Sequence, residues 1–201
     1  MKTTKRKLAA GPLVAWLASA AIAALGCASS PDTETPSVAT ASPAPAAFSP
    51  GDVTGPFTWG AATRVTHLRH LWFADQPDEA GFAAAKAEGV TLVIDLRAPT
   101  ERDWDERAVV EGLGLAYANV PVTGDAFDPA AFARIEALVQ AQQGAPTLIH
   151  CSTSNRAGAW LAAHLVEAHG LSRDDALAIG RRAGITNEKI VERLDAYLDA
   201  R

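Results

Sequence analysis

The stretch Pro146-Thr147-Leu148-Ile149-His150-Cys151-Ser152-Thr153-Ser154-Asn155-Arg156-Ala157-Gly158-Ala159-Trp160 organises the chain. Its apolar beginning predicts a short buried strand, its polar middle a tight loop, and its last part a helix that starts at about Arg156. Such a turn gathers backbone N–H groups at a helix N-terminus, where the helix dipole favours an anion. The stretch therefore predicts an anion pocket between a strand and a helix.

Cys151 stands at the end of the predicted strand, facing this pocket, and Arg156 stands at the start of the predicted helix. Because the dipole and a nearby cation both stabilise a thiolate, this arrangement suits a nucleophile that attacks or carries an anionic group. The alternative is a small core residue, since cysteine is among the residue types most often buried. The polar loop and Arg156 favour a functional thiol.

Composition and motifs exclude several other classes of protein. The 201 residues carry a formal net charge of -5, so general nucleic-acid binding is not expected. The sequence has neither a glycine-rich nucleotide loop nor a serine nucleophile elbow, and we predict no cofactor. On a strand His67 and His70 would lie on opposite faces, without a third ligand at a diagnostic spacing, so we predict no metal site.

The first residues have the pattern of a secretory signal over 1–26. A basic start precedes an apolar run over 8–25, which ends in small residues before Cys27. This pattern resembles a bacterial lipoprotein signal, although its leucine is one residue nearer to Cys27 than in the commonest form. The resemblance implies lipidation of Cys27 and a protein anchored to a membrane by its lipid, on the periplasmic or cell-envelope side. The alternative is an uncleaved anchor, because the run is near the lower limit of about 17–20 residues for a span.

Residues 27–55 are rich in Ser, Thr, Pro and Ala, a composition that predicts a disordered linker. Residues 56–201 are then long enough for one domain. Cys27 and Cys151 are the two cysteines of the chain, so lipidation of Cys27 would leave Cys151 without a partner in the same chain.

Strands and helices alternate along the domain. We expect a strand or hairpin over 64–74, strands over 90–96, 115–122 and 146–150, and helices over about 78–88, from about 100 to 112, over 129–143, over 156–168, after Ser172, and after Thr186 or Asn187. The near-continuous apolar run over 90–96 is typical of a strand buried on both faces. The fold class is therefore α/β, with a mostly parallel central sheet flanked by helices. Loops that follow strands, at Arg97, Asp125 and Cys151, should converge at one edge of the sheet.

Four pieces of sequence, in order over about 66–168, resemble the cysteine-dependent dual-specificity phosphatase superfamily. They are the Asp75-Gln76-Pro77 turn, Val93-Ile94-Asp95-Leu96-Arg97 with Glu101, Val120-Pro121-Val122, and His150-Cys151-x-x-x-Asn155-Arg156. The closer resemblance is to bacterial phosphatase-like domains of beta-lactamase-hydrolase-like proteins and of proteins fused to NAD-kinase-like domains. It implies a dual-specificity-phosphatase-like fold and hydrolysis of a phosphomonoester.

The resemblance also implies roles for the residues of the loop. Cys151 would attack phosphorus and Arg156 would hold the phosphate oxygens in two-point contact. Backbone N–H groups of the anion-binding loop would stabilise the transition state; the loop consists of Ser152, Thr153, Ser154, Asn155 and Arg156. His150 would support the loop.

A carboxylic acid should protonate the leaving group, and the family position of this acid is the loop after Val122. We predict Asp125 for this role and keep Asp128 in reserve. Asp128 precedes a proline at a predicted helix start, where an aspartate commonly caps the helix instead. Asp95, Arg97 and Glu101 are expected to form a charge network beside the site, with a structural role.

The loop departs from the phosphatase pattern in length and composition. Four residues separate Cys151 from Arg156, where phosphatases usually have five. This spacing resembles rhodanese-type sulfurtransferases, so a Cys151 persulfide is the alternative, and the substrate is either a phosphorylated or a sulfur-bearing anion. Ser154 stands where related loops often have glycine, and Ala157 lacks the usual hydroxyl, which leaves a non-catalytic anion-binding module as a third reading.

Overall fold

The computed structural model describes residues 48–123 and 125–201 of the chain. The predicted signal, Cys27 and most of the predicted linker lie outside the described residues. Within the described ranges, no helix combines the length and the apolar character that a membrane crossing requires.

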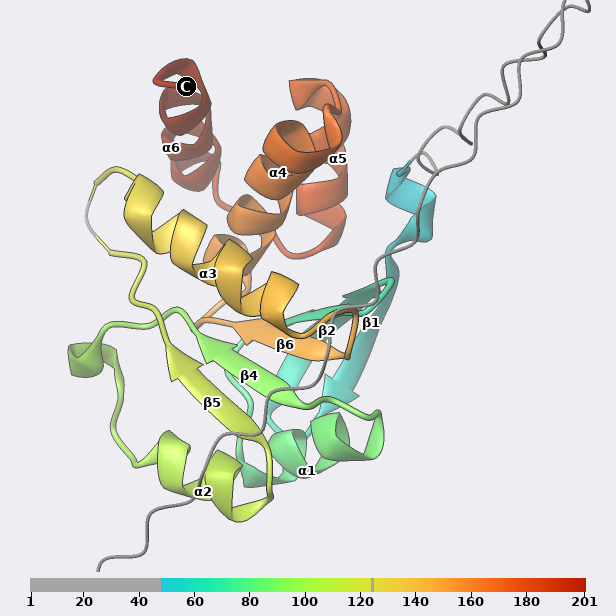
Figure 1. Ribbon diagram of the computed structural model, residues 1–201, viewed down its shortest axis with the longest axis vertical. Helices are drawn as coiled ribbons and strands as arrows, with labels where there is room; N and C mark the ends of the chain where they lie inside the picture. Colours follow the sequence, from blue (N-terminus) through green and yellow to red (C-terminus); the bar gives the residue numbers. More distant parts are fainter. Residues whose placement is uncertain (1–47, 124) are drawn as a thin grey trace, which may run out of the picture. The chain divides into compact units, whose positions relative to one another are not determined.

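A six-stranded sheet forms the centre of the domain (Figure 1). The strands are β1 (Thr54–Trp59), β2 (Ala62–Leu68), β3 (Leu71–Ala74), β4 (Leu92–Asp95), β5 (Ala116–Asn119) and β6 (Thr147–His150), in the order β1-β2-β3-β6-β4-β5. Strands β3, β6, β4 and β5 pair in parallel, whereas β1, β2 and β3 form an antiparallel meander. The predicted α/β fold with a mostly parallel sheet is confirmed, with antiparallel strands at one edge.

Helices cover both faces of this sheet (Figure 1). They are α1 (Glu79–Ala87), α2 (Glu106–Gly112), α3 (Pro129–Ala141), α4 (Asn155–His169), α5 (Arg173–Arg182) and α6 (Glu188–Asp199), with short 3₁₀ turns η1 (Pro50–Asp52) and η2 (Pro99–Glu101). Figure 1 shows α1 and α2 on one face and α3 and α4 on the other, and both α5 and α6 pack against α4.

Strands β4 and β6 lie inside the sheet with a strand on each side, and every residue in them is buried. Side chains alternate between the two faces of a strand. Val93 and Leu148 belong to the apolar cluster under α1 and α2, whereas Ile94 and Ile149 belong to the cluster under α3 and α4. This double burial explains why these strands appear in the sequence as continuous apolar runs.

The ends of the helices follow local side-chain chemistry. Ser172 caps α5 by accepting from the Asp175 amide, and Asn187 caps α6 by accepting from the Lys189 amide. Asp78 caps α1 by accepting from the Gly81 backbone N–H. The Asp75 carboxylate, three residues earlier, accepts from the backbone N–H of Arg64 on β2.

One strand and one helix differ from those expected. No strand was expected before residue 64, and composition placed Thr54 in the linker, but β1 covers Thr54–Trp59 and Thr54 pairs with His67. This edge strand was missed because only Trp59 of its residues is buried, so no apolar alternation marks it. The helix expected from about Thr100 is divided in two. A 3₁₀ turn ends at Glu101, and α2 begins only after Asp105, whose side chain caps it.

Candidate functional site

Strand β6 delivers Cys151 to the carboxyl edge of the sheet. The Cys151 amide donates to the carbonyl of Ala74 at 3.3 Å, which continues the pairing of β6 with β3. The Cys151 side chain is a free thiol within the described part of the chain, and it is fully buried. The thiol therefore lies beneath the residues that follow it in the loop.

A buried network of charges fixes the ends of β4 and β6 below the loop. Asp95 and His150 are direct partners across these strands. Arg97 donates to Asp95 at 2.9 and 3.1 Å and to Glu106 at 2.6 Å. The His150 Nε2 lies 3.1 Å from Oε1 of Glu106. The second acid of this network, beside Asp95, is therefore Glu106 rather than the expected Glu101.

The charges in the network compensate one another. Burial alone would raise the pKa of Asp95, but its bonds to Arg97 together with the nearby His150 outweigh burial and lower this pKa. The Tyr117 hydroxyl donates to Asp95, and burial raises the pKa of this phenol. Asp95, Glu106 and His150 are near enough to share a metal ion. However, Arg97 already bonds both carboxylates and supplies the positive charge that an ion would bring.

Arg156 is held by Glu101 on the η2 turn. The Arg156 Nη1 donates to one Glu101 oxygen at 2.8 Å, and Nη2 donates to the other at 2.7 Å. The carbonyls of Leu96 and Val122 also accept from Nη1, and the Ser152 hydroxyl accepts from Nη2. The guanidinium thus spans the loops that follow β4, β5 and β6.

This pair has strong electrostatic consequences. The bonds from Arg156 lower the pKa of Glu101 from 4.5 to about 2. Burial alone would lower the pKa of Arg156, but its bonds to Glu101 and its contact with the Cys151 side chain raise it instead. Arg156 therefore remains a cation beside the sulfur.

Ser154 turns the loop into α4 in a strained conformation. Its φ is 64°, in the left-handed region that costs a residue with a Cβ more than it costs glycine. Its buried hydroxyl donates to the carbonyl of Ala183 at 3.0 Å. Gly184 faces this side chain, and a Cβ there would lie 2.3 Å from the Ser154 oxygen. The hydroxyl contact and the close approach of Gly184 hold the turn from the α5–α6 side.

The side chain of Asn155 joins the loop to α6. Its Oδ1 accepts from the backbone N–H groups of Thr186 at 2.8 Å and Asn187 at 3.0 Å. Its Nδ2 donates to the hydroxyl of Thr153 at 3.0 Å. These side-chain bonds of Asn155 therefore position the loop and the start of α6 relative to each other. Thr153 also forms an isolated bridge with Asp75, which ties the loop to the end of β3.

A cavity of about 320 Å³ opens beside the loop. Residues of the loop, of its neighbouring turns and of α6 line it: Glu101, Val122, Thr123, Thr153, Asn155, Arg156, Asn187, Ile190 and Arg193. Another cavity, of about 240 Å³ between α3 and α4, contains no residue of the loop. Three residues of the predicted anion-binding loop, Thr153, Asn155 and Arg156, therefore line the first cavity, whereas the buried Cys151 is not part of the lining.

Neither of the two candidate acids is part of this cavity lining. The Asp128 side chain accepts from the Ala130 amide and caps α3, as the alternative for this residue predicts. Asp125 is exposed, and its charge acts on Arg193 of α6. Arg193 is a site residue that sequence reasoning missed, because no motif marks it and α6 is remote from the loop in sequence.

Comparisons with solved structures identify the fold. A DUF442 protein from Shewanella putrefaciens CN-32 is 21% identical, with a TM-score of 0.57 over 71% of this chain and 88% of that one. P. aeruginosa TpbA, in a cysteine-to-serine form in complex with phosphotyrosine, is 21% identical, with a TM-score of 0.57 over 79% and 91%. Kinase associated phosphatase is 16% identical, with a TM-score of 0.56 over 65% and 86%.

The domain therefore has the α/β fold of the dual-specificity-phosphatase-like proteins. No protein-family model matches the chain, and no curated protein matches it in sequence. The likeness is therefore one of overall structure, over 65–79% of this chain.

Proposed function

We propose that the protein is a cysteine-dependent phosphatase that hydrolyses a phosphomonoester at Cys151. The observation that carries this proposal is the position of Cys151 at the end of a buried parallel strand, within the electrostatic influence of Arg156 and at the start of a loop that lines a polar cavity. The fold, shared with TpbA and kinase associated phosphatase, supports it.

The reaction has two steps. The Cys151 thiolate attacks phosphorus, an S–P bond forms, and the bond from phosphorus to the leaving oxygen breaks. The leaving oxygen takes a proton, and Asp125 is our candidate donor. Water then attacks the phosphocysteine, the S–P bond breaks, and phosphate leaves with the thiolate restored. Arg156 and the loop N–H groups stabilise the charge on the phosphoryl oxygens in both steps.

In the observed arrangement, neither the Cys151 sulfur nor the Arg156 guanidinium is available to a substrate. Cys151 is fully buried, and the Glu101 carboxylate takes the two guanidinium nitrogens that would bind phosphate oxygens. A phosphate group offers the same paired oxygens as a carboxylate and a larger charge. Substrate binding therefore requires displacement of Glu101 from Arg156.

Sulfur transfer is the second candidate, and two observations favour it. The loop has four residues between Cys151 and Arg156, and Glu101, held ionised by Arg156, is the one acid that the described residues contribute to the cavity lining. Sulfur transfer needs no acid for a leaving oxygen. The Cys151 thiolate would take a sulfane sulfur from thiosulfate with release of sulfite, and cyanide would take that sulfur as thiocyanate.

Paired turnover assays distinguish these functions. The full chain, purified in detergent and kept reduced, is given an aryl phosphate in one assay and thiosulfate with cyanide in the other, with Cys151→Ser as control. Phosphate release that depends on Cys151 supports the phosphatase, whereas thiocyanate alone overturns it in favour of sulfur transfer. Absence of both products would favour an anion-binding module without catalysis.

We also propose that the domain is tethered outside the cytoplasm by a lipid on Cys27. The support is the sequence pattern of a lipoprotein signal before Cys27. Metabolic labelling with a fatty acid should mark the wild type and not Cys27→Ala. Equal labelling of both proteins would contradict the proposal.

A further inference from the structure

The cavity beside the loop contains two arginines, and their surroundings differ. Both guanidinium ends of Arg156 are bonded to Glu101, and Nη1 also reaches two backbone carbonyls. In contrast, Nε and Nη2 of Arg193 are buried and find no hydrogen-bond acceptor among residues 48–123 and 125–201. A buried charged donor without an acceptor is costly. Arg193 lines the cavity and forms no ion pair with a carboxylate among these residues, so it is the cation that an anionic ligand would pair with.

Packing holds Arg193 in this position. Its guanidinium carbon lies 4.3 Å from the centre of the Phe127 ring, a cation–π contact, and Phe127 is itself buried against Phe132. Burial and the nearby charge of Arg156 lower the pKa of Arg193, and the charge of Asp125 opposes this effect. Two arginines and one carboxylate, Glu101, line this cavity, so an anion that displaced Glu101 from Arg156 would lie between two cations and be stabilised by both.

The helical spacing of α6 places Arg193 in the lining of the cavity that the loop also lines. Asn187, Ile190 and Arg193 are spaced by three residues, so they share one face of the helix, and all three line the cavity. The Asn155 amide bonds the backbone at Thr186 and Asn187, which fixes the start of this helix to the cysteine loop. Arg193 is therefore positioned by the same residue that shapes the loop.

We propose that Arg193 is a second anion-binding residue of this site and that the substrate carries a second anionic group beside its phosphate. This inference rests on the proposed phosphatase function and names its substrate class: bisphosphates, or monoesters with an adjacent carboxylate or phosphate. Arg156 binds the phosphate that is transferred to Cys151, and Arg193 binds the second anion.

The test compares two non-hydrolysable probes. Methylphosphonate carries one anionic group and methylenediphosphonate carries two, and calorimetry on the full chain in detergent measures the dissociation constant of each. We expect the wild type to prefer the diphosphonate by tenfold or more, and Arg193→Gln to reduce this preference to about threefold or less. The Arg193→Leu variant keeps apolar packing on Phe127 without the charge, and it should show the same loss if the Gln variant fails to fold.

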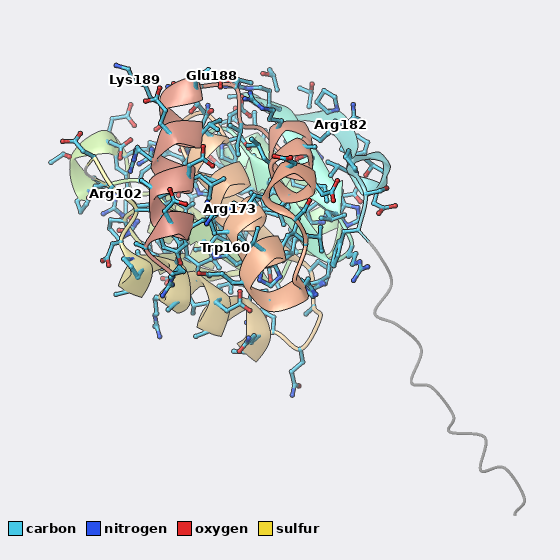
Figure 2. All side chains as sticks on the ribbon, turned by 90° about the horizontal axis from the view of Figure 1, so that it is seen from above. Arg102, Trp160, Arg173, Arg182, Glu188 and Lys189 are labelled. Carbon is cyan, nitrogen blue, oxygen red and sulfur yellow. The ribbon has the colours of Figure 1, made fainter. Side chains whose placement is uncertain are left out.

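Lys189→Gln is the matched control, because it removes the same charge from the same helix. Figure 2 shows Lys189 at the start of α6 pointing away from the fold, and it is not part of the cavity lining. The Lys189→Gln variant should prefer methylenediphosphonate over methylphosphonate by the same factor as the wild type. The inference would be overturned if the Arg193 variants bound both phosphonates more weakly by the same factor, or if they kept the wild-type preference for the diphosphonate.

The test also separates this inference from the proposed function. A preference lost with Arg193 in a protein that releases no phosphate would support the anion site and contradict the phosphatase. Phosphate release from an aryl phosphate, in a protein whose preference does not depend on Arg193, would support the phosphatase and contradict the second anion site.

Discussion

The carboxylate of Glu101 and the guanidinium of Arg156 form a two-point pair, with N–O distances of 2.7 and 2.8 Å. The Ser152 hydroxyl donates to the same carboxylate at 3.2 Å. Glu101 thus makes contacts with Arg156 and the loop that a substrate oxyanion would make. While this pair is formed, Glu101 occupies the Arg156 nitrogens that a substrate oxyanion would need.

Replacement of Glu101 by Gln should tighten the binding of simple oxyanions. The variant removes a negative charge and weakens the competitor for Arg156, so we expect the inhibition constant of inorganic phosphate to fall about fivefold. Competition assays against an aryl phosphate measure this constant. Glu111→Gln is the control, because Glu111 pairs with Arg107 on α2 and does not line the cavity. Weaker phosphate binding in the Glu101 variant would show that the pair positions Arg156 for substrate.

The same pair predicts a pH dependence of stability. Arg156 lowers the pKa of Glu101 from 4.5 to about 2, so its stabilisation is complete above pH 4.5 and is lost as the pH falls through about 2. Because the pair is partly exposed to solvent, we expect it to contribute about 1 kcal/mol. Urea unfolding should show that the stability difference between wild type and Glu101→Gln is largest near neutral pH and shrinks in acid. A difference that grows in acid would contradict this assignment.

Asp125 and Asp128 should respond differently to substitution. Asp128→Ala removes the cap of α3, so it should lower the free energy of unfolding by about 1 kcal/mol and leave kcat unchanged. Asp125→Asn should leave stability unchanged and slow hydrolysis of an alkyl phosphate by about 100-fold, since a poor leaving group needs a proton. The pH–rate profile should lose its basic limb in the Asp125 variant. An unchanged profile would remove Asp125 from the mechanism.

Gly184→Ala should damage the cysteine loop. The new Cβ would lie 2.3 Å from the Ser154 hydroxyl, and the φ of Gly184 is +129°, so we expect a loss of about 3 kcal/mol in unfolding free energy and a large loss of kcat. Gly170→Ala is the matched control. It also has a positive φ, but its Cβ would meet open space, so it should cost only about 1 kcal/mol and leave kcat unchanged. Equal effects of both variants would show that backbone strain alone is responsible.

Local patterns predicted the fold class and the central strands, although they missed β1 at the edge of the sheet. The apolar runs that contain Val93 and Leu148 indicated strands buried on both faces, and the structure places them at the centre of the sheet. Ser172 and Asn187 indicated helix starts through their side-chain oxygens. These signals depend on neighbours a few residues away, which is the range in which sequence patterns are informative.

The arrangement of the site depended on contacts that local patterns do not encode. Glu101 was expected in the network of Asp95 and Arg97, but it pairs with Arg156, which is 55 residues away in sequence. The Asn155 amide meets the backbone of Thr186, 31 residues away. Such pairs follow from how loops and helices pack at the edge of the sheet, so the three-dimensional fold was needed to find them.

The Asn155 side chain makes the length of the cysteine loop and the position of α6 depend on each other. An extra residue between Cys151 and Arg156 would move Asn155 away from Thr186 and Asn187, or move Arg156 away from the sulfur. A chimera in which the segment from Thr186 through α6 came from another protein would lose Arg193 and would change the backbone that Asn155 bonds. Changes in substrate preference within this architecture should therefore require coordinated substitutions in two distant segments, rather than drift in either segment alone.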